Sequence, residues 1–194
     1  VVIAGALGAG RAIGVADETA LKALTLACIA LSSLFLFLIA SDLWDGPLAL
    51  LPSAAWSTYP LALWLTKQPN SEVPFTVLLF GMAFVVWRLL RSANARVGLV
   101  VAAGALAGSA MLVRPIAILL PLVAAALAMA LGSSWGWGRR LILGTAILAV
   151  SLLVIGPWER HASAAAGRFV ILSTGGVPSV RDGLTFGVNP DKSY

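Results

Sequence analysis

The sequence predicts an all-α fold: a polytopic integral membrane helical bundle of about six transmembrane helices, followed by a polar loop. Apolar residues make up 60% of the 194 residues, charged residues make up 11%, and mean hydropathy is +0.96. A soluble domain carries about 45–50% apolar and about 25% charged residues. The charges also avoid the middle of the chain, because residues 19–158 hold only 11 of the 21. A soluble globule of this size could not hide so much apolar surface from water.

Six uncharged, mostly apolar stretches approach the length of about 17–25 residues that a spanning helix needs. They are residues 23–40, 47–66, 73–87, 97–113, 116–134 and 141–156. Charged residues, glycines and prolines separate the stretches and are expected to end the helices. Arg114-Pro115 ends the fourth stretch and Gly156-Pro157-Trp158 ends the sixth. Arg88 and Arg91 follow the third, where their long side chains can reach the lipid headgroups.

The distribution of charge divides the chain into three parts. Residues 1–18 form a segment expected at the outer face or the membrane interface, because its apolar part, residues 1–13, is too short to span. Residues 19–158 form the transmembrane helical domain. Residues 159–194 carry seven charges and are expected to form an extracytoplasmic loop or the start of a truncated soluble region. We interpret the sequence as a fragment that is open at both ends.

Basic residues in the short loops predict the orientation of the bundle. The loops at 41–46, 88–97 and 132–140 contain five lysines and arginines, and the opposite loops at 67–73 and 114–115 contain two. Cytoplasmic loops carry the excess of lysine and arginine, so the first group is expected in the cytoplasm. This topology also accounts for the net charge of +5, which in a soluble protein would suggest a nucleic-acid partner. No nucleic-acid partner is expected here.

Three further features narrow the chemistry. Gly104-x-x-x-Gly108 is a small-residue motif that favours close packing of helices in lipid. His161 is the only histidine, which excludes a site of several histidines within this sequence. The sequence assigns no cofactor and no metal, although a divalent cation stays an open alternative.

Glu72 is the first candidate site residue. It lies at the start of the third apolar stretch, in Asn70-Ser71-Glu72-Val73-Pro74. A carboxylate at a helix N-terminus can cap the helix and gains from the helix dipole. Alternatively, it is held at the membrane surface to bind a metal or to orient a polar substrate.

Arg114, Lys67 and Arg160 are expected at the same membrane surface as Glu72. An arginine at a membrane boundary can simply extend to the headgroups, or its planar guanidinium can bind a phosphate or a carboxylate. Several cations and one carboxylate would suit an anionic lipid headgroup. Interfacial anchoring, helped by nearby aromatic side chains, is the alternative that needs no ligand.

Three segments together resemble a known family. They run from Tyr59-Pro60 to Ser71-Glu72, from Gly104 to Pro115 and from Gly156 to Gly176. They resemble the GT-C glycosyltransferases of the dolichyl-phosphate-mannose-protein mannosyltransferase type (family 39) and their bacterial relatives. The chain departs from the family pattern in several places, including the turn at 41–46 and the tail after Gly176. Ser71 stands where threonine is usual, and ungapped alignment puts His161 at the position of the family arginine.

The resemblance implies an enzyme of the plasma membrane, the inner membrane in bacteria. It would transfer a sugar from a polyprenyl-phosphate-linked donor to a lipid, glycan or protein acceptor at the extracytoplasmic face. By resemblance, Glu72 corresponds to the second acidic site, and the main catalytic base is expected upstream of Val1, so the fragment by itself is expected to be inactive. Arg114, Lys67, Arg160 and His161 are the candidates for binding the donor phosphate.

Two other functions stay open at this point. A transporter or lipid flippase would also be helical, but it predicts ionisable residues within the spans and broken helices in paired halves. The six apolar stretches contain no charged residue, which argues against this alternative. A membrane subunit without chemistry predicts that the polar residues of the outer loops tolerate substitution.

Overall fold

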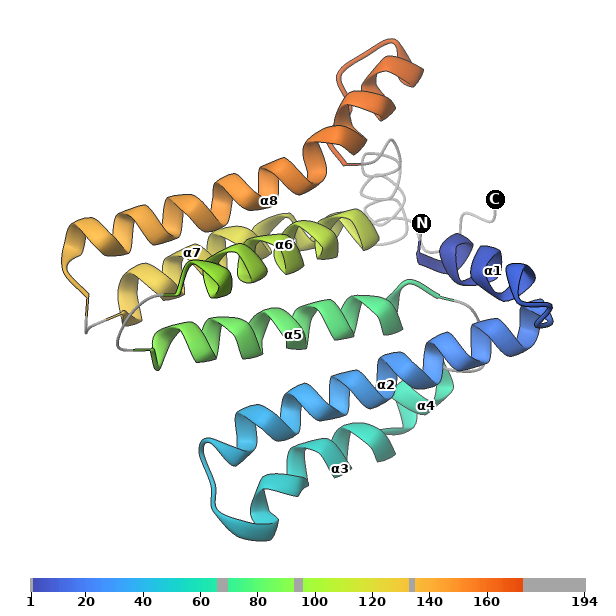
Figure 1. Ribbon diagram of the computed structural model, residues 1–194, viewed down its shortest axis with the longest axis horizontal. Coiled ribbons are helices and arrows are strands. Elements are labelled where there is room, and N and C mark those ends of the chain that lie inside the picture. Colours follow the sequence, from blue (N-terminus) through green and yellow to red (C-terminus); the bar gives the residue numbers. More distant parts are fainter. Residues whose placement is uncertain (1, 66–69, 93–95, 133–134, 173–194) are drawn as a thin grey trace, which may run out of the picture.

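A computed structural model describes residues 2–65, 70–92, 96–132 and 135–172, and all the regular structure in these ranges is helical (Figure 1). The helices are α1 (Val2–Ala12), α2 (Asp17–Ser41), η1 (Gly46–Leu50), α3 (Leu51–Thr58), α4 (Pro60–Leu65), α5 (Glu72–Leu90), α6 (Val97–Val113), η2 (Pro115–Leu119), α7 (Leu120–Leu131) and α8 (Trp137–Ala166). This confirms the predicted all-α bundle.

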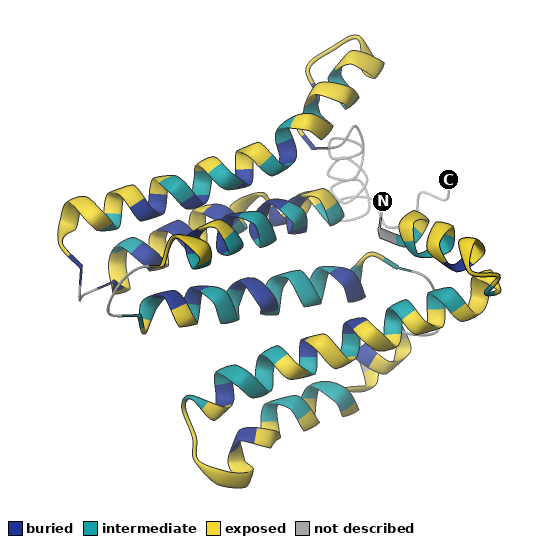
Figure 2. Cartoon of the chain, in the orientation of Figure 1, coloured by how far each residue is buried: buried dark blue, intermediate teal, exposed yellow. Residues whose placement is uncertain are grey.

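The helices have the length and composition of membrane-spanning segments. Within the described ranges, α2, α5 and α8 are each long and apolar enough to cross a membrane, and α6 and the segment 115–131 are shorter apolar helices. Large apolar side chains such as Leu26 and Leu153 lie exposed on the outer surface. Figure 2 shows the buried residues where α5, α6, α7 and α8 face one another. An apolar outer surface around a packed interior fits a helical bundle in lipid.

Small residues let α6 and α8 approach each other closely. A Cβ atom on Gly104 would lie 2.7 Å from the carbonyl oxygen of Ile147, and one on Gly108 would lie 2.9 Å from that of Ser151. The Ser151 hydroxyl donates a hydrogen bond to the Gly104 carbonyl at 2.9 Å. Fully buried alanines, including Ala103 and others on α6 and α7, continue this close packing. The packing interpretation of the small-residue motif is therefore confirmed.

The prediction of a continuous span over residues 47–66 was wrong. The chain there forms the short helices η1, α3 and α4, which return alongside α2 (Figure 1). Pro47, Pro52 and Pro60 lie at or near the beginnings of these three pieces. Proline fits the first turn of a helix but interrupts the hydrogen bonds of its interior. Hydropathy alone could not detect these interruptions, because the stretch is uncharged and mostly apolar.

The predicted end of the sixth span at Gly156-Pro157-Trp158 was also wrong. Helix α8 continues through Pro157 to Ala166 and ends at Gly167, whose φ of +62° is in the left-handed region that glycine adopts easily. Four of the nine residues after Pro157 in the helix are alanine, the strongest helix former. Figure 1 shows α8 changing direction in its last turns, as expected when proline removes a backbone hydrogen bond. The predicted domain boundary between residues 158 and 159 therefore lies inside a helix.

The bundle has two ends. At one, which we call the Glu72 end, α5 begins and α6 ends. At the other, which we call the Asp42 end, α2 and α5 end and α6 begins. The fourth predicted span, residues 97–113, is confirmed as α6. Arg114 adopts an extended conformation, with φ of −140°, because a residue before proline disfavours the helical region.

Candidate functional site

An ion pair joins the two strongest candidate residues at the Glu72 end. Arg114 Nη1 lies 2.8 Å from Glu72 Oε1, and the two side chains are 34% and 42% exposed. Glu72 is the first residue of α5, and Arg114 follows the last residue of α6. Since α5 and α6 pack against each other, the start of one lies beside the end of the other.

Asn70, rather than Glu72, caps helix α5. Its side-chain oxygen Oδ1 accepts hydrogen bonds from the backbone N–H groups of Glu72 at 3.0 Å and Val73 at 3.2 Å. These are donors that the first turn of a helix leaves without an internal partner. The capping interpretation of the Glu72 side chain was therefore wrong. Its carboxylate is available to Arg114 and still benefits from the positive end of the helix dipole.

An aromatic ring also contacts the Arg114 guanidinium. The guanidinium carbon lies 5.9 Å from the centre of the Phe75 ring, three residues after Glu72 on α5. The ring and the carboxylate together hold the guanidinium at the start of α5. A guanidinium has five N–H donors, so donors beyond the bond to Glu72 can reach a second anion such as a phosphate.

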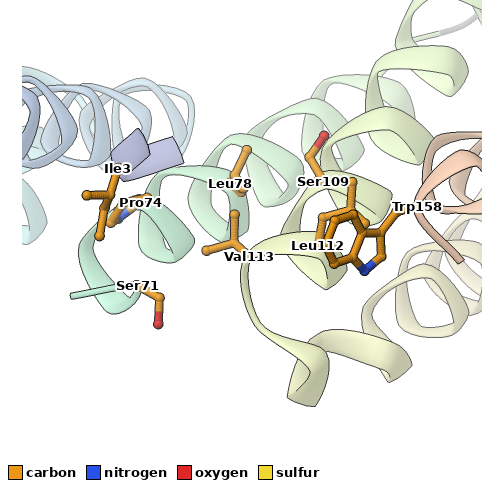
Figure 3. Close-up of a pocket in the computed structure, with 8 residues that line it drawn as sticks. All are labelled: Ile3, Ser71, Pro74, Leu78, Ser109, Leu112, Val113 and Trp158. Atoms are coloured by element: carbon orange, nitrogen blue, oxygen red, sulfur yellow. The ribbon is translucent and has the colours of Figure 1, made fainter. Parts of the chain in front are cut away.

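A largely apolar cavity of about 460 Å³, lined in part by the residues that directly precede Glu72 and Arg114, is shown in Figure 3. Its volume is in the range of small-molecule sites, about 300–1,000 Å³. Helices α1, α5, α6 and α8, together with the residue that precedes α5, line it through Ile3, Ser71, Pro74, Leu78, Ser109, Leu112, Val113 and Trp158. Ser71 directly precedes Glu72, and Val113 directly precedes Arg114. Each residue of the ion pair is therefore the sequence neighbour of a residue that lines the cavity.

The wall of the cavity at α8 is fixed by the segment that follows the helix. The indole Nε1 of Trp158 donates a hydrogen bond to the carbonyl oxygen of Leu172 at 3.0 Å. The backbone N–H of Val170 donates to the Ser163 hydroxyl at 3.0 Å. These bonds hold the chain after Gly167 against the last turns of α8 and keep Trp158 in place.

The remaining candidates are not part of this pair. Lys67 lies outside the described residues. Arg160 and His161 are exposed on α8, and the His161 ring lies 6.1 Å from that of Trp158. No contact between described residues joins Arg160 or His161 to Glu72. Their role at the donor phosphate stays a prediction.

The described part of the chain brings together no group of three or more histidine, cysteine, aspartate or glutamate side chains that could hold a metal ion. The structure therefore assigns no metal site in these ranges. The sequence reasoning missed Asn70 and Phe75. The position of Asn70 just before a helix could have indicated its capping role, and Phe75, at i+3 from Glu72, lies on the same helix face.

Comparison with known proteins supports the resemblance seen in the sequence. No curated protein and no solved structure matches this chain. The sequence profile of one family, described as dolichyl-phosphate-mannose-protein mannosyltransferase, matches residues 3–159. This range covers most of the chain and includes Glu72, Arg114 and the residues that line the cavity, but it ends within α8, before Arg160 and His161. The chain therefore belongs to the dolichyl-phosphate-mannose-protein mannosyltransferase family, whose members are membrane glycosyltransferases of the GT-C type.

Proposed function

We propose that this protein transfers a sugar from a polyprenyl-phosphate-linked donor to an acceptor at the extracytoplasmic face of the membrane. The observation that carries the proposal is the Glu72–Arg114 ion pair, with its 2.8 Å contact, beside the apolar cavity of about 460 Å³. A donor of this class has an apolar chain, a charged phosphate and a polar sugar. The site offers an apolar cavity for the chain and, beside it, a guanidinium for the phosphate.

The reaction needs positive charge where the phosphate leaves. Transfer breaks the bond between the sugar C1 and the phosphate oxygen and forms a bond from C1 to the acceptor oxygen. The polyprenyl phosphate departs with the bonding electron pair, and a carboxylate base takes the acceptor proton. Arg114 donates hydrogen bonds to the developing charge on the phosphate, which is the form of stabilisation that contributes most in such sites.

Glu72 has a supporting place in this scheme. By resemblance it corresponds to the second acidic site, and a different carboxylate is the principal base in the proposal. Its carboxylate holds the Arg114 guanidinium at the cavity, so that the arginine is positioned before the donor binds. Lys67, Arg160 and His161 add positive or hydrogen-bonding groups near the phosphate in the proposal.

The proposed apolar subsite follows from the lining of the cavity. Pro74, Leu78, Leu112 and Val113 offer hydrocarbon surface from α5 and α6. Isoprene units gain about 25 cal/mol for each Å² of apolar surface removed from water. The Ser71 and Ser109 hydroxyls are the polar groups of the lining, apart from the Trp158 indole. We propose that the first isoprene units of the donor lie here while its phosphate reaches Arg114.

The test is sugar transfer by the full-length protein in lipid vesicles with a polyprenyl-phosphate-linked mannose donor. Arg114→Ala is expected to lower transfer by about a hundredfold, the typical cost of removing one preorganised donor from an active site. Glu72→Gln is expected to lower transfer as well, because Arg114 loses the negative charge that positions it. Glu18→Gln is a matched control. Glu18 also forms an exposed ion pair, with Lys22 at 2.6 Å in the first turns of α2, but neither residue lines the cavity. Near-normal transfer by both site variants would contradict the proposal.

A further inference from the structure

A second cavity lies at the Asp42 end of the bundle. Its lining is mostly charged, whereas that of the first cavity is largely apolar. It has a volume of about 440 Å³ and is lined by Asp42, Arg88, Arg91, Ser92, Arg96 and Leu99. Leu99 is the one apolar residue in this lining. Three guanidinium groups and one carboxylate surround the space, which leaves two positive charges in excess. The proposed sugar transfer does not use this cavity.

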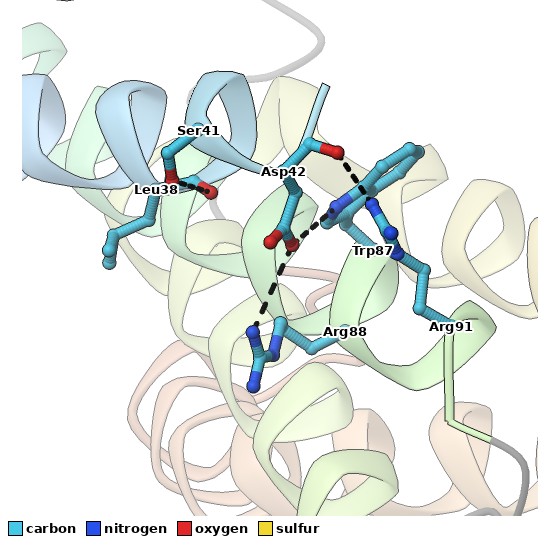
Figure 4. A network of polar contacts seen from close by, with 6 residues as sticks. All are labelled: Leu38, Ser41, Asp42, Trp87, Arg88 and Arg91. Atoms are coloured by element: carbon cyan, nitrogen blue, oxygen red, sulfur yellow. Dashed lines mark hydrogen bonds and ion pairs between the residues drawn. The ribbon is translucent and has the colours of Figure 1, made fainter. Parts of the chain in front are cut away.

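A hydrogen bond holds one of these arginines, Arg91, at the cavity (Figure 4). Arg91 Nη1 donates to the backbone carbonyl of Asp42 at 2.8 Å, and its guanidinium carbon lies 5.4 Å from the centre of the Trp87 ring. Arg91 is thus positioned by a neutral oxygen and a ring, so that its positive charge is retained. An arginine that merely extended toward lipid headgroups would need no such contacts within the protein.

The carboxylate of Asp42, the only one in this lining, is closer to the Trp87 indole than to any of the arginines. Trp87 Nε1 donates a hydrogen bond to Asp42 Oδ2 at 3.0 Å, whereas Arg88 Nη1 is 3.9 Å from the same oxygen. Arg96 forms no ion pair with any described residue. Among the described residues, no ion pair or hydrogen bond occupies the Arg96 guanidinium, so its donors can face an anion in the cavity.

The position of the cavity indicates which kind of anion can reach it. Helices α2 and α5 end at Ser41 and Leu90, and α6 begins at Val97, so the cavity lies where the apolar helices meet water. This is the level of lipid headgroups. The start of α6 adds the positive end of a helix dipole to the charge of the arginines.

We propose that this cavity binds a phosphate group, and that the phosphate belongs to the headgroup of an anionic membrane lipid. Guanidinium groups bind phosphate oxygens through paired N–H donors. The charged lining suits a headgroup rather than a hydrocarbon chain. The lipid chains would lie outside the cavity, along the apolar surfaces of α2 and α5. Such a lipid would tie together the ends of α2 and α5 and the start of α6, at the opposite end from Glu72.

The experiment measures binding of a short-chain phosphatidic acid to the full-length protein in a neutral detergent, with short-chain phosphatidylcholine and inorganic phosphate as the comparison ligands. Phosphatidic acid is expected to bind at least about tenfold more tightly than either comparison ligand. Phosphatidylcholine also carries a phosphate, but its choline balances the charge, so equal binding of phosphatidylcholine would overturn the preference for an anionic headgroup. Equal binding of inorganic phosphate would overturn the lipid as its source.

Variants test whether binding occurs at this cavity. Arg88→Gln combined with Arg96→Gln is expected to weaken phosphatidic acid binding at least about tenfold. Arg139→Gln is the control, because Arg139 lies at the same end of the bundle but does not line the cavity. Unchanged binding by the double variant, or an equal loss in the control, would overturn the assignment.

Asp42→Asn is a variant that is expected to bind phosphatidic acid more tightly, a result that a loss of folding cannot produce. An asparagine Oδ1 can still accept the Trp87 hydrogen bond, while the negative charge that repels a phosphate is gone. Phosphatidic acid is therefore expected to bind several times more tightly to Asp42→Asn than to the unaltered protein. Unchanged or weaker binding by this variant would overturn the proposal even if the arginine variants fail to fold.

Discussion

Ser151 on α8 donates its hydroxyl hydrogen bond to the carbonyl oxygen of Gly104 on α6, across 2.9 Å. The bond forms because Gly104 has no side chain to separate the two helices. It links two segments that are 47 residues apart in the sequence. Together with the Glu72–Arg114 ion pair at the end of α6, this contact fixes how α6 lies between α5 and α8.

Gly104→Ala is expected to destabilise the bundle. The added Cβ would lie 2.7 Å from the Ile147 carbonyl oxygen and 2.7 Å from the Val150 Cβ. A backbone oxygen cannot move aside as a flexible side chain can, so the helices must separate at a cost of about 1–3 kcal/mol. Reversible unfolding in mixed micelles measures the change in free energy. Gly98→Ala is the matched control, because a Cβ there meets nothing within 4 Å. Equal effects of the two variants would contradict the proposed packing constraint.

Exchanging the charges of the ion pair separates its structural role from its chemical role. Glu72→Arg and Arg114→Glu are each expected to lower stability, because two like charges then face each other. The double variant is expected to recover a coupling free energy of about 0.2–1 kcal/mol, the size found for pairs that stay partly exposed. Sugar transfer should stay low in the double variant, because the phosphate then meets a carboxylate at residue 114. Full recovery of transfer would show that the pair is structural only.

Asn70→Ala is expected to loosen the first turn of α5. The substitution removes the acceptor for the N–H groups of Glu72 and Val73, and the loss of such a cap costs about 1 kcal/mol. Amide hydrogen exchange should become faster at these two residues, while the middle of α5 changes little. Asn70→Asp is the conservative comparison, because its carboxylate can accept the same hydrogen bonds. Unchanged exchange in Asn70→Ala would contradict the capping role.

Gly10→Ala is expected to displace α1 from α2. A Cβ on Gly10 would lie 2.7 Å from the Ala20 Cβ, whereas one on Gly8 meets nothing within 4 Å. Helix α1 contributes Ile3 to the cavity at the Glu72 end, so its displacement should raise the KM for the polyprenyl-phosphate donor several-fold. Gly8→Ala is the control and should leave the KM unchanged. The same KM in both variants would show that α1 does not shape the donor site.

The sequence alone determined the class of this protein and many of its helix ends. Hydropathy is a local property, so it predicted apolar helices between the charged residues but missed the breaks near Pro52 and Pro60. The end of α6 at Val113 follows from Pro115, since the proline acts on the residue before it. Placing Glu72 and Arg114 at the same surface needed only the order of the spans. The family resemblance likewise rests on residues read in order along the chain.

Tertiary structure decided which of these residues meet. Packing of α5 against α6 brings Arg114 to Glu72 and Phe75. It also left Arg160 and His161 without a contact to Glu72 in the described residues. At the other end, Asp42 meets Trp87 and Arg91 across more than 40 residues of chain. A sequence pattern shows that basic residues gather in these loops, but the distances between side chains depend on helix packing. Each such contact requires two distant segments to be ordered together, and its formation depends on the free energy of the whole bundle.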